Sequence, residues 1–169
     1  RPADAETEAL RAWTSLRFTV EDEAALLDLQ RDALAVAHEV RLDNLLWDGD
    51  REPEALRMVD RVSPGWQALA RARLALQADD AGVGALIEAV PANLANDAGL
   101  AFDRFVWRMR KERYDDAAAL LIDRSASPAS LGRPEVWADR RAVLARWLMR
   151  NGKPQDAYRA ASSHHLTAG

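Results

Sequence analysis

The chain has 169 residues, no cysteine, and a formal net charge of −4 from 27 acidic and 23 basic residues. The absence of cysteine excludes disulfides, thiol catalysis and cysteine-ligated metals, and the acidic balance excludes a positive field that would hold nucleic acid across the whole surface. From the charge balance we expect no nucleic-acid partner. No apolar run approaches the roughly 20 residues that a membrane span needs, so we also expect no membrane span. Alanine and arginine are abundant and β-branched residues are sparse, which predicts an all-α fold.

In the first half of the chain, punctuation residues mark helix ends. Asp48-Gly49 predicts a helix end, because glycine accepts the left-handed conformation that is common there. Ser63-Pro64 predicts the start of the helix that contains GWQALARARLAL, since the first helical turn tolerates proline. Residues 91–97, PANLAND, are expected to connect two helices.

In the second half, apolar residues recur at the spacing of amphipathic helices. They lie at Phe102, Phe105, Val106 and Met109, and again at Tyr114, Ala117, Ala118 and Leu121. Residues 123–134 are expected to form a connection with a short helical turn after Pro128. A further helix is predicted to start at Pro134 and to end at Asn151-Gly152, with Trp137, Leu144 and Leu148 on its buried stripe.

Helices predicted in this way come in pairs, and an alanine follows the turn of each pair. Aligning Ala25, Ala55, Ala85, Ala117 and Ala157 gives intervals of 30, 30, 32 and 40 residues. A period in the thirties is typical of tetratricopeptide-like arrays, in which each helix pair buries its apolar face against the next. We therefore predict one domain over residues 1–169, an irregular superhelix of stacked antiparallel helix pairs. A compact bundle is the alternative.

No residue pattern supports catalysis or metal binding. His164 and His165 are adjacent, so on a helix their side chains would point about 100 degrees apart and could not share a metal ion. A pair at a helix end, where the C-terminal dipole favours histidine, is the expected arrangement. We predict no catalytic residue, no metal site and no cofactor for this chain by itself.

Two groups of arginines are candidates for binding. Arg108 and Arg110 lie in WRMRKERY, and Arg140 and Arg141 lie on the first helix of the last pair. If both groups line the concave side of a superhelix, they form a stripe suited to an anionic polymer. The alternatives are a solvated charged face and, for the first group, stabilisation of a helix C-terminus.

The segments LLWDGDREPEALRMV, SPGWQALARARLAL and FVWRMRKERYDDAAALLIDRSAS, followed by LGRPEVWADRRAVLARWLMRNGKPQDAYRAASSHHL, resemble the N-terminal helical region of soluble lytic murein transglycosylases. The resemblance covers the chain from about Ala12 to its end. It implies a periplasmic protein in which a helical superhelix precedes a lysozyme-like domain. That domain cleaves peptidoglycan with a catalytic glutamate and leaves a 1,6-anhydro product.

The chain contains no Glu-Ser motif of that catalytic domain, so no catalytic residue carries over. The resemblance implies a fragment of a lytic transglycosylase: a non-catalytic scaffold that helps to position peptidoglycan and a downstream catalytic domain. The expected partners are peptidoglycan, through the parent protein, and that downstream domain. A tetratricopeptide-like protein–protein interaction module is the alternative function.

Overall fold

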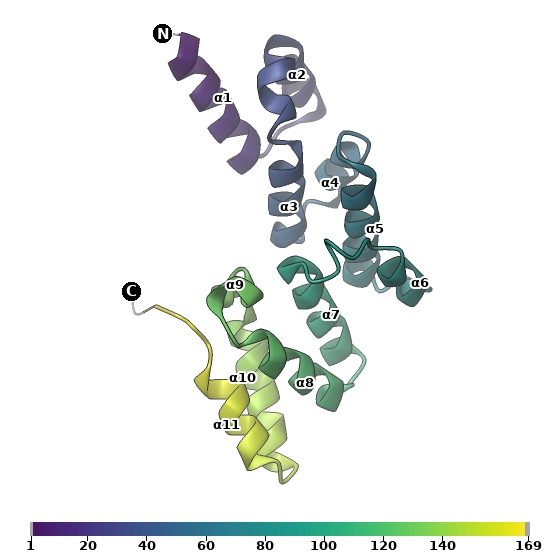
Figure 1. Ribbon diagram of the computed structural model, residues 1–169, viewed down its shortest axis with the longest axis vertical. Helices are drawn as coiled ribbons and strands as arrows, with labels where there is room; N and C mark the ends of the chain where they lie inside the picture. Colours follow the sequence, from purple (N-terminus) through teal and green to yellow (C-terminus); the bar gives the residue numbers. More distant parts are fainter. Residues whose placement is uncertain (1, 168–169) are drawn as a thin grey trace. The chain divides into compact units, whose positions relative to one another are not determined.

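The chain is entirely helical throughout the part that the structure describes. The computed structural model describes residues 2–167, with the side chains of residues 4–167. Eleven helices and no strand occur in this range, which confirms the all-α prediction (Figure 1). The helices are α1 (Pro2–Ser15), α2 (Val20–Ala35), α3 (His38–Asp48), α4 (Glu52–Val59), α5 (Pro64–Ala78), α6 (Val83–Glu88), α7 (Ala98–Arg110), α8 (Tyr114–Arg124), α9 (Pro128–Leu131), α10 (Pro134–Arg150) and α11 (Pro154–Ser162).

The helix boundaries follow the local chemistry of glycine and proline. Gly49 has φ 72° and caps α3, and Pro64 and Pro134 begin α5 and α10, as predicted. The short helical turn expected after Pro128 is α9. Proline suits a first helical turn because the backbone N–H that it lacks has no partner there.

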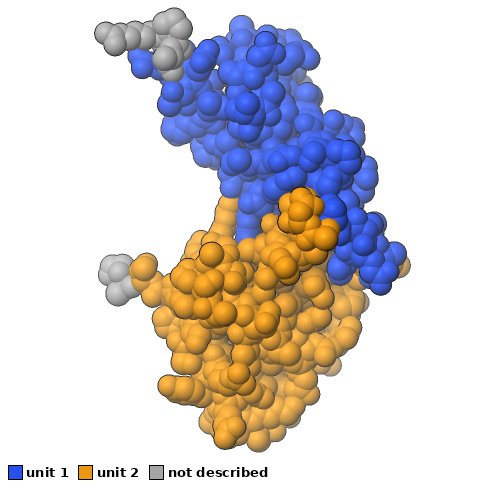
Figure 2. Space-filling model, viewed as in Figure 1, with its two compact units in different colours: residues 1–74, 84–91 blue, residues 75–83, 92–169 orange. Residues whose placement is uncertain are grey.

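The helices divide into two compact units (Figure 2). Unit 1 comprises residues 2–74 and 84–91, and unit 2 comprises residues 75–83 and 92–167, so that α5 begins in unit 1 and ends in unit 2. Each unit has its own apolar core. The single superhelical domain over residues 1–169 stays a prediction beside this division.

Unit 1 is built on helices α1 to α4, with α1 against α2 and α3, and α3 against α4. Its core contains the fully buried side chains of Trp13, Leu34, Leu42 and Met58. The core also encloses an ionic network, which the apolar pattern of the sequence does not predict.

Arg41 lies at the centre of this network and ties four segments together. Its guanidinium donates hydrogen bonds to the backbone carbonyl of Trp13 at 2.6 Å, to the carboxylate of Glu54 at 3.1 Å and to that of Glu23 at 3.4 Å. Arg51 donates to the same Glu54 carboxylate at 2.8 Å. Burial raises the pKa of Glu54, but the hydrogen bonds from Arg51 and from the N–H of Phe18, together with the charges of Arg51 and Arg41, outweigh burial, so that the pKa lies below its ordinary value. Glu54 therefore stays ionised at neutral pH and serves as a structural anion.

Unit 2 is built on α7 to α11, with α7 against α8 and α9, and α10 against α11 and α8. Phe105, Leu121, Trp137, Leu144 and Leu148 are fully buried in its core. Trp137, Leu144 and Leu148 occupy the buried stripe of α10, as their spacing predicts.

The two helix pairs of unit 2 repeat one another at an interval of 40 residues. WRMRKERYDDA at 107–117 aligns with WLMRNGKPQDA at 147–157, with five of eleven residues identical. The backbone repeats as well. Arg113 N–H donates to the carbonyl of Arg108, and Lys153 N–H donates to that of Leu148, each at 2.9 Å. Glu112 and Gly152, one residue earlier, have φ of 57° and 71°. Because sequence and turn geometry agree, the pairs α7–α8 and α10–α11 are two copies of one helix–turn–helix repeat.

The alanine alignment that suggested repeats is partly wrong. Ala55, Ala117 and Ala157 are buried, and each is the fourth residue of the second helix of its pair. Ala25 and Ala85, by contrast, are exposed and mark no close helix contact. Alanine is common throughout this chain, so a 30-residue interval between two alanines carries little information by itself.

Candidate functional site

Arg108 and Arg110, at the end of α7, both bind backbone carbonyls of unit 2. Arg108 is half-buried and donates to the carbonyl of Asp116 at 2.9 Å. Its burial, with help from the nearby charge of Arg104, lowers its pKa. Arg110 is exposed and donates to the carbonyl of Leu76 at 3.3 Å, in the last turn of α5. Each guanidinium has five N–H donors, so both can still bind a further acceptor.

Arg140 lies on the exposed face of α10. Its guanidinium carbon is 5.8 Å from the centre of the Phe102 ring, a separation at which a cation and an aromatic face attract one another. Its charge is available to solvent, so the structure leaves Arg140 free for the binding role predicted from sequence.

Arg141, the next residue, cannot take that role, and its prediction as a binding residue is wrong. Its side chain is only 4% exposed. The guanidinium donates to the carbonyl of Ala160 in the last turn of α11 at 2.5 Å, and to the hydroxyl of Ser125 at the end of α8 at 2.9 Å. Burial lowers the pKa of Arg141. The negative ends of two helix dipoles stabilise this buried cation, and its role is structural.

The two histidines lie beyond α11, which ends at Ser162, so the expected position at a helix end is wrong. His165 has φ 55°, and its Nε2 donates to the carbonyl of Ser125 at 2.8 Å. His164 instead accepts a hydrogen bond from the N–H of Leu166 through Nδ1. His165 therefore fastens the final segment to the end of α8.

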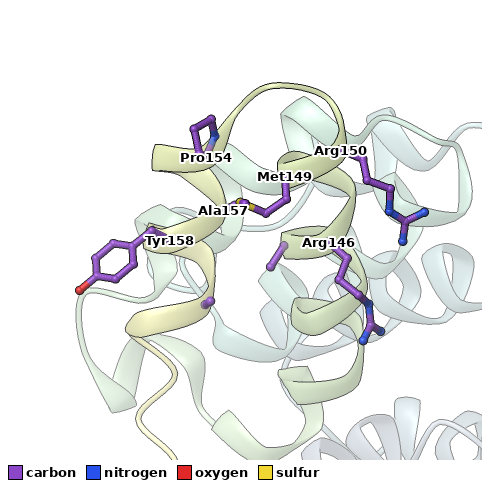
Figure 3. Close-up of a pocket in the computed structure, with 8 residues that line it drawn as sticks. Arg146, Met149, Arg150, Pro154, Ala157 and Tyr158 are labelled. Atoms are coloured by element: carbon purple, nitrogen blue, oxygen red, sulfur yellow. The ribbon is translucent and has the colours of Figure 1, made fainter.

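An apolar groove lies between α10 and α11. Its volume is about 450 Å³. Ala145 and Met149 of α10 and Pro154, Ala157, Tyr158 and Ala161 of α11 line it, together with Arg146 and Arg150. The short alanine side chains let the surface sink between the helices. Figure 3 shows Met149 reaching between them, while Arg146 and Arg150 extend from the outer side of α10 and Tyr158 extends from α11.

Two properties distinguish this groove from an ordinary helix surface. Met149 is 59% exposed and Tyr158 is 73% exposed, so large apolar side chains meet solvent there. No carboxylate lines the groove, and neither Arg146 nor Arg150 forms an ion pair with any residue that the structure describes. Exposed apolar surface beside unpaired cations is typical of a binding surface.

No protein family, curated protein or solved structure matches this chain. What the candidate site can bind is therefore inferred from its own residues alone. In residues 2–167, no helix has the length and apolar character that crossing a membrane requires. Across the same residues, no three side chains of His, Cys, Asp or Glu come close enough together to hold a metal ion.

The burial of Arg141 and the groove between α10 and α11 were not predicted, although the sequence contains a signal for each. Arg141 shares the helical stripe of Trp137, Leu144 and Leu148, and this position indicates burial. The groove follows from the 40-residue repeat, because Ala145 and Pro154 replace the larger Phe105 and Tyr114 of the first copy.

Proposed function

We propose that this chain is a non-catalytic scaffold segment of a periplasmic lytic murein transglycosylase. In this proposal the helix pairs stack as an irregular tetratricopeptide-like superhelix. The superhelix positions peptidoglycan for a lysozyme-like domain of the parent protein. The parent would cleave the glycan strand, and this segment would only hold it.

The repeated helix pair is the observation that carries the proposal. Pairs α7–α8 and α10–α11 share sequence, turn geometry and a buried alanine, as a repeat array requires. The same segments resemble the helical region of lytic transglycosylases, and this resemblance is the reason to propose that family and peptidoglycan as the bound polymer.

Three of the predicted arginines stay candidates for contact with murein. Arg110 and Arg140 are exposed, and Arg108 is half-buried. Murein carries carboxylates on its peptides, and the attraction between exposed charges falls as salt rises. The proposal therefore gives these arginines a positioning role and gives none of them a catalytic one.

Cosedimentation with purified murein sacculi tests this function. We expect the chain to sediment with sacculi at low salt, to release no muropeptide, and to bind less when Arg108, Arg110 and Arg140 are all replaced by alanine. Arg31→Ala is the matched control, because Arg31 is an exposed arginine on α2 of the other unit. Unchanged binding by the triple variant would remove the arginines from the proposal. Failure to bind sacculi at any salt concentration, or a reading frame without a lysozyme-like domain, would remove the function.

A protein–protein interaction module is the second candidate, and the groove between α10 and α11 favours it. Amphipathic helices bind in apolar grooves through side chains at helical spacing. This function predicts that Met149→Glu abolishes binding of a protein partner and leaves sacculus binding unchanged. Loss of both activities in this variant would show that the groove belongs to the murein-binding surface.

A further inference from the structure

The surface that forms the groove on α10–α11 is covered in the other copy of the repeat. On α7–α8, the positions equivalent to Ala145 and Pro154 are Phe105 and Tyr114. The ring of Phe105 stacks on that of Trp137, with 5.1 Å between the ring centres, and the ring centres of Tyr114 and Trp147 are 4.7 Å apart. Both tryptophans belong to α10. The chain thus covers one copy of this surface with a helix and leaves the second copy open.

The charge around the open copy specifies the helix that fits it. Arg146 and Arg150 flank the apolar floor without a carboxylate partner among the described residues. The nearest acidic residue on the same stripe of α10 is Asp139, about two helical turns before Arg146. A helix that places apolar side chains on Met149 and carboxylates beside the two arginines would satisfy both the floor and the rim.

Helix α2 of this same chain has that chemistry. Leu29 is 78% exposed, and Val36, immediately after α2, is 81% exposed. Asp28 and Asp32 are exposed beside them. Asp28 forms only a solvent-exposed pair with Arg31 at 3.4 Å, and Asp32 has no charged partner among residues 2–167. The hydroxyl of Thr19 caps α2 by accepting from the N–H of Asp22. Gln30, with φ −135° and ψ 26°, kinks the helix between Leu29 and Asp32.

We propose that the groove between α10 and α11 binds helix α2 of a second copy of this chain. Leu29 enters the groove against Met149 and Ala145, and Asp28 and Asp32 pair with Arg146 and Arg150. The contact is heterologous, because each copy contributes a different surface. It goes beyond the scaffold function and needs no peptidoglycan.

Sedimentation velocity of the full chain tests this contact in the absence of murein. We expect the average mass to rise with protein concentration between about 10 µM and 1 mM, the range in which a small interface associates, and less steeply as salt increases. Leu29→Glu on α2 and the double variant Arg146→Glu, Arg150→Glu on the groove should each weaken association at least about 10-fold. The first buries a carboxylate against the apolar side chains of Met149 and Ala145, and the second places like charges beside Asp28 and Asp32. All three positions are exposed, so folding is unaffected. Leu56→Glu is the matched control, since Leu56 is an exposed leucine on α4.

Mixing the two variants gives the decisive result. Each variant retains one intact surface, so an equimolar mixture should form a 1:1 dimer and nothing larger. A wild-type chain that stays monomeric at the highest concentration would overturn the proposal, as would association that either variant leaves unchanged or a mixture that stays monomeric. The sacculus assay gives its own answer for the scaffold function, because it uses different variants and a different ligand.

Discussion

Adjacent arginines on α10 provide a sharp test of the assignments in unit 2. Arg140 is exposed over Phe102, whereas Arg141 is buried and caps the ends of α8 and α11. Replacing each in turn by methionine, which keeps much of the length of the side chain, removes the same charge from two different environments. We expect Arg141→Met to destabilise the fold and Arg140→Met to leave it unchanged.

The size of the effect follows from the contacts. Arg141 donates two hydrogen bonds from a charged group, and each contributes about 1.5–3 kcal/mol. Part of that loss is offset, because methionine removes the cost of burying a cation that has no carboxylate partner in the described chain. A net loss of about 2 kcal/mol remains, since the Ala160 carbonyl and the Ser125 hydroxyl are left without this donor. For a chain of this length that corresponds to a fall in Tm of about 4–8 °C.

Thermal and urea unfolding followed by far-ultraviolet circular dichroism measure this difference, with sacculus cosedimentation as the second readout. Arg140→Met should keep wild-type stability and bind sacculi less, whereas Arg141→Met should be less stable and bind sacculi as the wild type does at a temperature where it stays folded. If Arg141→Met unfolds at the wild-type temperature, or if Arg140→Met is equally destabilised, the assignment of buried cap and exposed cation is wrong.

Three further perturbations test the cores of both units. Ala117→Leu should destabilise the α7–α8 pair by about 1–3 kcal/mol, because the larger side chain overpacks a buried position. Ala119→Leu, at an exposed position of the same helix, should change the stability little. Equal urea midpoints for the two variants would refute the close contact of α7 and α8 at Ala117. Arg41→Met should cost about 3 kcal/mol or more, because Glu23 and the carbonyl of Trp13 lose a buried partner, and hydrogen exchange in α1 and α3 should report the loss first. Burial, with the charges of Arg61 and Arg41, lowers the pKa of His38, so the folded state binds this proton less readily than the unfolded chain. Stability should therefore hold above about pH 6.5 and fall as the pH decreases below it, and His38→Gln should reduce that fall.

Local signals predicted the helices well, because the residues that end helices act within one turn. Pro64, Pro128 and Pro134 each begin a helix, and Gly49 ends one. The buried stripe of Trp137, Leu144 and Leu148 followed from spacing alone. These features depend on backbone conformation and periodicity, which neighbouring residues determine.

Features that depend on distant partners were not predictable in the same way. Arg41 is buried because carbonyls of α1 and carboxylates of α2 and α4 converge on it, and those partners lie between 13 and 28 residues away. The basic group on α10 predicts a binding role for Arg141, although its place on the apolar stripe indicates burial. The division into two units also depends on long-range packing that no single segment encodes.

The turns at Glu112 and Gly152 share one backbone conformation. Both close with the same bonds from residue 113 to 108 and from residue 153 to 148, although one carries glutamate and the other glycine at the left-handed position. A side chain makes that conformation about 1 kcal/mol less favourable, so the paired helices, and not the residue, impose the turn at Glu112. Transplanting Asn-Gly-Lys into positions 111–113 should therefore preserve α7 and α8 and relieve the strain. A chain assembled from copies of this unit could then be lengthened by joining pairs at turns whose geometry is already fixed.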